Sequence, residues 1–101
     1  MSFSDIKQAR EMKSRLDKAQ KELGKIIVEA NAGKGAVKVT MDGQQNLRSV
    51  EISPSVINPE KPKQLESLIL KAVNEANNKS QKEASKKLKT LTGDLKIPGL
   101  T

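Results

Sequence analysis

Four lysines in the C-terminal part of the chain are spaced as a stripe along one side of a helix. They follow one another at intervals of three, four and three residues: Lys79, Lys82, Lys86 and Lys89. At about 100° per residue they fall within an arc of roughly 80°, and the stripe is about 15 Å long. Ammonium groups spaced over this length can neutralise a few phosphates of a nucleic-acid backbone. The stripe therefore predicts a contact with a polyanion.

Further basic residues surround this stripe. Lys87 adds charge on another side of the same helix, and a looser basic stripe in the N-terminal segment comprises Lys7, Arg10, Lys18, Lys21 and Lys25. The N-terminal stripe is interpreted as more structural, because pairs such as Glu11–Arg15 and Lys18–Glu22 are spaced to support the helix locally. Both stripes lie roughly opposite the apolar positions, where any solvated helix places charge. Charge alone therefore leaves nucleic-acid binding and a solvated face open.

Most catalytic chemistry is excluded by composition. The 101 residues include no Cys and no His, which removes zinc sites, thiol nucleophiles and imidazole bases. No spaced group of carboxylates suggests a metal site, so no metal, cofactor or small-molecule substrate is expected. The sequence "GKG" at 33–35 lacks the spacing of a phosphate loop and predicts a tight turn. Asp42 and Glu51 are expected to be turn and surface groups. The chain is predicted not to be an enzyme.

The low numbers of aromatic residues and of arginines indicate which type of nucleic acid is bound. Phe3 is the only aromatic residue, whereas proteins that hold single strands usually stack bases on aromatic side chains. The only arginines are Arg10, Arg15 and Arg48, and specific readout of guanine usually uses arginine. Duplex DNA contacted through its phosphates, with low sequence specificity, is therefore the preferred hypothesis.

The charge is divided between the two flanks of the chain. Residues 1–26 hold 7 basic and 4 acidic residues, residues 27–59 hold 3 of each, and residues 60–101 hold 9 and 5. The neutral centre is interpreted as scaffold. The N-terminus has no apolar leader-like region, and no run approaches the roughly 20 apolar residues of a membrane span. A soluble cytoplasmic protein is expected.

The elements that must position the lysines are two helices and three strands. Apolar spacing predicts a helix over about 5–23, ended by Gly24, and a second over about 59–91. The second helix is predicted to begin at about Pro59, with Asn58 as cap, or at Lys63. Three strands are predicted at about 25–31, 36–42 and 46–53, with a turn at Asp42-Gly43. The fold class is α+β: an α-β-β-β-α chain whose three-stranded antiparallel meander is flanked by two long helices. Residues 1–93 form one domain and residues 94–101 a flexible tail. So short a chain with an aliphatic core is a candidate for dimer formation.

Three segments carry a resemblance to a known family. They are "KQAREMKSRLDKAQKEL" (7–23), "GAVKVTMDGQQNLRSVEISPSV" (35–56) and "LESLILKAVNEANNKSQKEASKKL" (65–88). In combination they resemble the YbaB/EbfC family of small bacterial nucleoid-associated proteins. The ending "LTGDLKIPGLT" departs from the Gly/Pro/Met-rich tail that is frequent in that family.

The resemblance implies a homodimer whose sheets meet in a central body. Pairs of helices would project from it like tweezers, and binding of DNA is attributed to these helices. Carried onto this sequence, the arm tips would be formed by two segments. One is the start of the helix over 5–23 (Lys7, Arg10, Lys13), and the other is the end of the helix over 59–91 (Lys82, Lys86, Lys87, Lys89). Scaffold or dimer-interface positions would be Val37, Val39, Val50 and Ile52.

Two other functions remain open from the sequence. Long amphipathic helices beside an apolar sheet could form a docking module for another protein, with the lysines as a solvated face. RNA could replace DNA as the polyanion. The first predicts little salt-sensitive DNA binding, and the second predicts that duplex RNA competes with duplex DNA.

Overall fold

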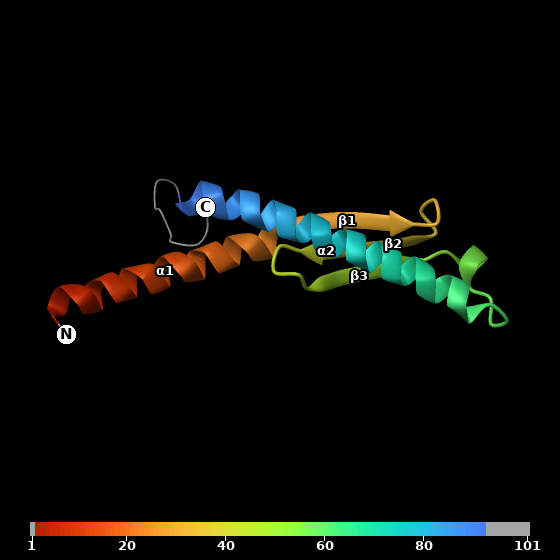
Figure 1. Ribbon diagram of the computed structural model, residues 1–101, viewed down its shortest axis with the longest axis horizontal. Helices are drawn as coiled ribbons and strands as arrows, with labels where there is room; N and C mark the ends of the chain where they lie inside the picture. Colours follow the sequence, from red (N-terminus) through yellow and green to blue (C-terminus); the bar gives the residue numbers. More distant parts are fainter. Residues whose placement is uncertain (1, 93–101) are drawn as a thin grey trace.

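The chain runs through a helix, three strands and a second helix (Figure 1). The elements are α1 (Phe3–Lys25), β1 (Ile27–Ala32), β2 (Val37–Asp42), β3 (Leu47–Ile52), a short 3-10 helix η1 (Pro54–Val56) and α2 (Pro62–Thr92). This computed structural model describes residues 2–92, and the predicted tail at 94–101 lies outside them. The strands form one antiparallel sheet in the order β1-β2-β3. The predicted α-β-β-β-α fold of the α+β class is therefore confirmed.

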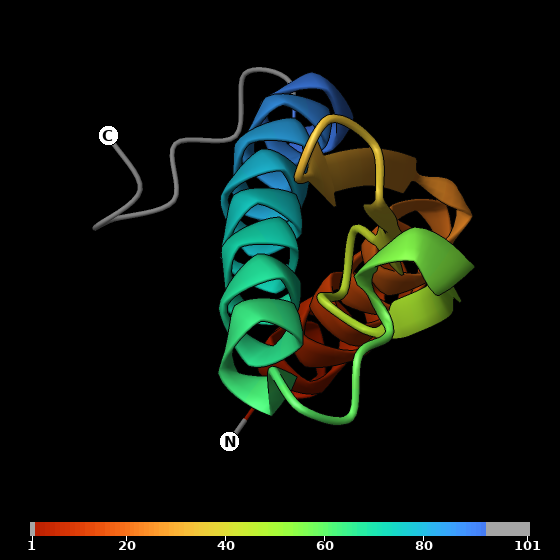
Figure 2. The ribbon, with the colours of Figure 1, turned by 90° about the vertical axis from the view of Figure 1, so that its right-hand side faces the viewer.

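The core lies between the sheet and α2. Alternate residues of β1 and β2 point to one face, and that face is apolar and buried. On α2 the fully buried residues that meet this face are small, namely Ala72, Ala76 and Ser80, while larger side chains such as Leu65, Ile69 and Val73 pack against the core partly buried. Small side chains let the helix approach the sheet closely. Figure 2 shows α2 running along one side of the sheet, as this packing requires.

β3 lies largely outside the cover that α2 provides. Val50 is paired with Val39, so both side chains are on the same face of the sheet. Val39 is fully buried, whereas Val50 is 47% exposed, because α2 packs mainly on β1 and β2. The outer edge of β3 has no further strand among the described residues. α2 therefore covers the apolar face of the sheet over β1 and β2 and leaves most of β3 exposed.

α1 projects from the body as an arm. It runs beyond the end of α2 (Figure 1), and the molecule measures 67 × 21 × 19 Å. Within α1 only Ala19 is buried, while Met12 and Leu16 of its apolar seam are 51% and 53% exposed. The predicted heptad-like seam is therefore present, but within one chain most of it has no partner among the described residues.

The end of α1 and the start of β1 each lie two residues beyond the predicted positions. α1 does not end at Gly24 but passes through it to Lys25, and Ile26 caps the helix by donating its N–H to Leu23 O at 3.2 Å. β1 consequently begins at Ile27 and not at residue 25.

Of the two predicted starts of the second helix, Pro59 and Lys63, the second is one residue from the observed start. Asn58 begins a turn and does not cap α2. Its carbonyl oxygen accepts from Lys61 N at 2.9 Å, and its side chain accepts from Glu60 N at 3.0 Å. α2 begins at Pro62, another proline that suits a first helical turn because it needs no N–H partner there.

Candidate nucleic-acid interface

The two basic helices leave the sheet on the same side. α2 is antiparallel to α1, and its C-terminal part lies beside the C-terminal part of α1 (Figure 1), where Lys87 Nζ is 3.9 Å from Glu22 Oε2. The two predicted groups of basic residues therefore do not meet at one tip. The α2 lysines lie nearer the body, and Lys7, Arg10 and Lys13 lie farther out on α1.

The stripe lysines Lys79, Lys82, Lys86 and Lys89 are exposed, and two of them have acidic partners in the same helix. Lys79 pairs with Glu75 at 3.5 Å and Lys86 with Glu83 at 3.4 Å, both within α2. Each partner is about half exposed. Surface pairs of this kind stabilise a protein by about 0–1 kcal/mol. Exchanging Glu83 for a phosphate at Lys86 would therefore cost little.

Lys79 has a second role at the edge of the sheet. Its Nζ donates to Glu29 O of β1 at 2.9 Å. A lysine over an edge strand covers backbone groups that another chain could otherwise pair with. At this end of the stripe the side chain is thus tied to the sheet, while Lys82 makes no ion pair with any described residue.

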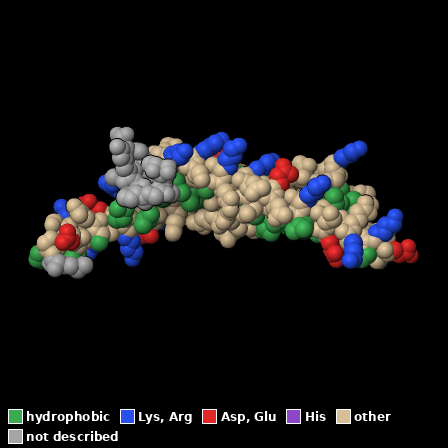
Figure 3. Space-filling model, in the orientation of Figure 1, with side chains coloured by type: hydrophobic (Ala, Val, Ile, Leu, Met, Phe, Trp, Pro, Cys, Tyr) green, Lys and Arg blue, Asp and Glu red, His purple; other side chains and the backbone are tan. Residues whose placement is uncertain are grey.

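The outer part of α1 carries basic residues without acidic partners. Lys7, Arg10 and Lys13 are exposed, and none forms an ion pair within residues 2–92. The pairs predicted from the spacing of Glu11–Arg15 and Lys18–Glu22 do not form within the described residues, and Glu22 instead pairs with Lys25 of α1 and Lys87 of α2. In Figure 3 basic side chains stand out from the surface over both helices, with hydrophobic side chains exposed on α1.

One face of α1 adds residues that the sequence interpretation treated as structural. A shallow hollow follows this face, and its lining residues are Arg10, Lys13, Ser14, Asp17, Lys18 and Lys21. Four of the six are basic. Lys18 and Lys21 belong to the same exposed surface as Arg10, so the basic face of the arm extends toward the body.

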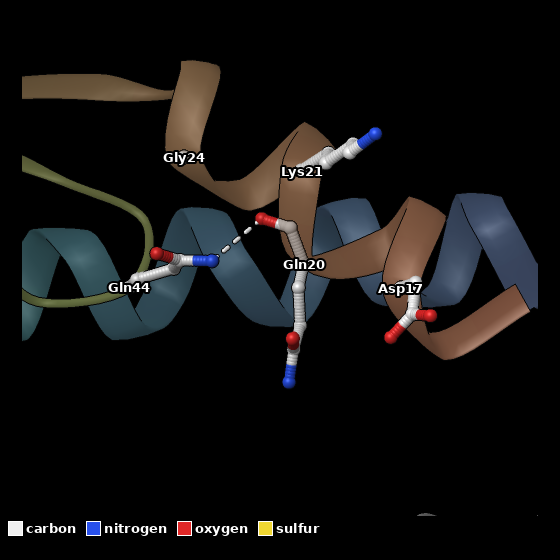
Figure 4. A pocket seen from close by; sticks show the side chains of 5 residues that line it. All are labelled: Asp17, Gln20, Lys21, Gly24 and Gln44. Atoms are coloured by element: carbon white, nitrogen blue, oxygen red, sulfur yellow. Dashed lines mark hydrogen bonds between the residues drawn. The ribbon is translucent and has the colours of Figure 1, made fainter. Parts of the chain in front are cut away.

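A second hollow, of about 500 Å³, lies where the arm joins the body. It is lined by Asp17, Gln20, Lys21 and Gly24 of α1 and by Gln44 of the turn between β2 and β3. Figure 4 shows the Gln44 side chain reaching across to α1, where its Nε2 donates to Gln20 O at 2.7 Å. The β2–β3 turn is therefore in direct contact with the last turns of the arm.

Asp42 is not the surface group that the sequence suggested. Its side chain is fully buried, although it begins a turn. Oδ1 accepts from Gln44 N at 2.8 Å and Asn46 N at 3.0 Å, and Oδ2 accepts from Arg48 Nε at 2.9 Å and Asn46 Nδ2 at 3.3 Å. The prediction of a turn was correct, but the prediction of an exposed carboxylate was wrong.

The hydrogen bonds also decide the charge state of Asp42. Burial alone raises the pKa of a carboxyl, but the donors from Asn46, Gln44 and Arg48 outweigh burial, so the pKa of Asp42 is lowered from its ordinary 3.8. The carboxylate stays ionised and pairs with Arg48 Nη2 at 2.8 Å. One of the three arginines is thereby committed to the turn. The spacing of Asp42, Asn46 and Arg48 is a signal that sequence analysis could have used, since Asp side chains often bond the backbone of the following turn.

The apolar positions named from the sequence divide into two groups. Val37 and Val39 are fully buried under α2, in the core of the single chain. Val50 is half exposed and Ile52 is partly buried against the core. Of these four residues, only Val50 and Ile52 of β3 are therefore positioned to contact another molecule.

Metal and membrane sites find no support in the part of the chain that the structure describes. No group of three or more acidic residues within 2–92 is arranged to hold a metal ion. Neither helix, as far as it is described, is apolar enough over a sufficient length to cross a membrane.

Fold and surface together define a class: a small α-β-β-β-α protein with two basic helices on one side of its sheet. The sequence model of the YbaB/EbfC DNA-binding family matches residues 3–95. The chain belongs to this family, which is one of DNA-binding proteins and not a class of enzymes.

Individual relatives agree with this membership. A "nucleoid-associated protein" of Pelotomaculum thermopropionicum is 45% identical over 95 residues, which cover 94% of this chain and 90% of that one. Another, from Moorella thermoacetica, is 42% identical over 94 residues, covering 93% and 90%. In three dimensions the chain is similar to the uncharacterized protein HP0035 of Helicobacter pylori, with a TM-score of 0.74 over 92% of this chain and 99% of that one. At 19% identity this likeness supports the fold alone.

Proposed function

We propose that this protein is a nucleoid-associated protein that binds duplex DNA through backbone phosphates, with low sequence specificity, as a homodimer. The observation that carries the proposal is the pair of basic helices that leave one side of the sheet together. The proposed contact residues are Lys7, Arg10, Lys13, Lys79, Lys82, Lys86, Lys87 and Lys89. The names of the relatives, nucleoid-associated proteins, support the location.

Contact with phosphates is favoured by how the basic groups are held. The chain has a net charge of +7, and the ion pairs of Lys86 and Lys87 lie on the surface, where they are weak. Phosphates can replace these carboxylates, and the counterions released from DNA drive the exchange.

Low specificity is favoured by the scarcity of groups that read bases. Arg48 is held by the buried Asp42, so Arg10 and Arg15 are the arginines left on the arm. Lysines act on phosphates as point charges and select little between base sequences. The protein is therefore expected to recognise the shape and charge of the duplex.

A homodimer would complete what a single chain leaves unfinished. β3 has an open edge and a half-exposed Val50, while α1 leaves Met12 and Leu16 half exposed. Exposed apolar surface of this extent usually marks an interaction site. A second copy is the occupant we propose, since the exposed β3 positions continue the apolar face that already forms the core.

The proposal is tested by removing charge at one place only. Replacing Lys82, Lys86, Lys87 and Lys89 together with Gln should weaken binding to a duplex at least tenfold, with the dimer intact. A matched control removes the same charge from the opposite end, at the exposed residues Lys34, Lys38, Lys61 and Lys63. The control should bind within a few-fold of the unmodified protein. Equal losses in the two variants would contradict the assignment and indicate that only net charge matters.

One observation favours a second function, docking of another protein. The apolar seam of α1 is open over Met12 and Leu16. If a partner other than a second copy occupies it, DNA binding should be weak at all salt concentrations. Competition between duplex DNA and duplex RNA at one salt concentration separates the third possibility, an RNA-binding protein.

A further inference from the structure

The attachment of the arm is narrow compared with its length. α1 has 23 residues, so it is about 35 Å long, and a tilt of about 5° at its base would move its tip by about 3 Å. Its only buried residue is Ala19, and it meets the body mainly through α2 and β2 near its C-terminal end. A few contacts at that end therefore decide where Lys7 and Arg10 lie.

The β2–β3 turn supplies several of these contacts by bonding to carbonyl groups of the helix end. Gly43 N–H is shared between Leu23 O at 2.9 Å and Ile26 O at 3.1 Å. Gln44 Nε2 donates to Gln20 O at 2.7 Å (Figure 4). The last carbonyls of a helix lack partners within the helix, and here the Gly43 N–H of the neighbouring turn donates to Leu23 O.

The turn that holds the arm is itself anchored in the core. The Asp42 carboxylate is surrounded by four donor groups of Gln44, Asn46 and Arg48. The Asp42 carbonyl oxygen accepts from Ser80 Oγ of α2 at 2.6 Å, and Ser80 is fully buried. Residues 42–44 thus connect α1 to the middle of α2 through a chain of hydrogen bonds.

A glycine is required at position 43 because α1 passes close to it, and not because the turn needs a left-handed backbone there. A Cβ atom at this position would lie 2.5 Å from Leu23 O and 3.2 Å from Ile26 Cδ1. The backbone of Gly43 is outside the left-handed region, unlike that of Gly33 and Gly35. Any side chain at 43 would therefore leave the turn conformation accessible but push α1 away from the sheet.

We infer that the turn from Asp42 to Asn46 is a positioning socket: it fixes the angle at which α1 leaves the body. Asp42 and Gly43 are positioning residues in this scheme, since neither is placed to touch a ligand of the basic face. The consequence for DNA rests on the proposed function. With the angle fixed, Arg10 and Lys13 on α1 can engage a duplex at the same time as the α2 lysines.

Distances within the protein test the socket without any DNA. The chain has no native Cys, so spin labels can be placed at Gln8→Cys on the exposed arm and Glu51→Cys on the exposed side of β3. Labelled chain is diluted with unlabelled chain so that double electron–electron resonance reports the distance within one chain. The test variant is Gly43→Ala. The control is Gly35→Ala, which forces a strained φ of +86° at the far end of the sheet.

The socket predicts different results for the two glycines. Gly43→Ala should shift the mean distance by about 3 Å or more, or clearly broaden its distribution, while Gly35→Ala should destabilise the fold but leave the distance unchanged. If Gly43→Ala does not fold, Gln44→Ala, which removes only the bond to Gln20, should broaden the distribution. If the distance distribution is unchanged in every socket variant that folds, Gly43→Ala or Gln44→Ala, the inference is overturned.

Binding to a duplex then separates the inference from the proposed function. Gly43→Ala retains every basic residue, yet it should bind a duplex several-fold more weakly than Gly35→Ala. A shifted distance with unchanged affinity would retain the socket but contradict its role in DNA binding. If the unmodified protein binds no duplex, the proposed function fails, while the distance measurement still decides on the socket.

Discussion

Asp42 shows how much one side chain determines in this small molecule. It is buried and ionised, it organises the turn, and its main chain is bonded to α2 through Ser80. A buried charge is tolerated only where it is paired and hydrogen-bonded. Arg48 and the turn amides meet this requirement, so the carboxylate stabilises the turn as long as it remains ionised.

Replacing Asp42 with Asn should lower the free energy of unfolding by about 1–3 kcal/mol, the usual cost of leaving a buried partner unsatisfied. The amide keeps the size of the side chain but cannot accept from both Arg48 and the backbone donors. Urea unfolding at neutral pH measures the change. Glu51→Gln, at an exposed position of β3, is the control and should change stability by less than about 0.5 kcal/mol.

The same pair of variants should differ in acid. Because the pKa of Asp42 is lowered below 3.8 in the folded protein, its stabilising contribution is complete above 3.8 and is lost as the pH falls from 3.8 through the folded value. Asp42→Asn should lack this component, so the stability difference should shrink on acidification below pH 3.8. A difference that does not shrink as the pH falls below 3.8 would contradict the role of the carboxylate.

Residues of this kind are hard to predict from sequence. The pair Asp42-Gly43 predicted a turn correctly, because local turn chemistry is written in neighbouring residues. Its burial depends on the end of α1, about twenty residues earlier, and on Ser80 of α2. Ser80 itself lies in a polar stretch of the sequence, yet it is buried because it continues the helical seam of Ala72 and Ala76 against the sheet. There its hydroxyl donates to the Asp42 carbonyl oxygen.

At the scale of elements, α2 has the most predictable pattern. Its apolar and small positions recur with helical spacing, and Ala72, Ala76 and Ser80 of that seam are buried against the sheet. The errors lie at the ends. A glycine such as Gly24 often ends a helix, but here the helix continues to Lys25, and Ile26 and the β2–β3 turn donate to the carbonyl groups at its end.

β3 is the element that a second copy should cover. Val50→Lys places a charge at the half-exposed apolar position of this strand and should convert the dimer to a monomer, as measured by analytical ultracentrifugation. Ser49→Lys adds the same charge on the opposite, polar face and should leave the dimer intact. A dimer that survives Val50→Lys would show that β3 is not the interface and direct attention to the seam of α1.

At the scale of the whole molecule, length and charge distribution explain the proposed activity together. The molecule is 67 Å long and only about a third as wide, at 21 × 19 Å. The neutral centre of the sequence forms the sheet, and the basic flanks form the two helices. The sequence predicted this division, since it depends on local composition. It could not predict the angle at which α1 leaves the body, because that angle depends on contacts between distant segments of the chain.

The salt dependence of DNA binding is the first measurement to make, because contacts with phosphates release counterions from the duplex. Affinity for an arbitrary duplex would be measured by fluorescence anisotropy at several salt concentrations from about 50 to 200 mM. If the four lysines at the end of α2 each neutralise one phosphate, log affinity should fall linearly with log salt, and affinity should drop at least about a hundredfold over this range. No binding at the lowest salt concentration, or an affinity that does not change with salt, would contradict the account.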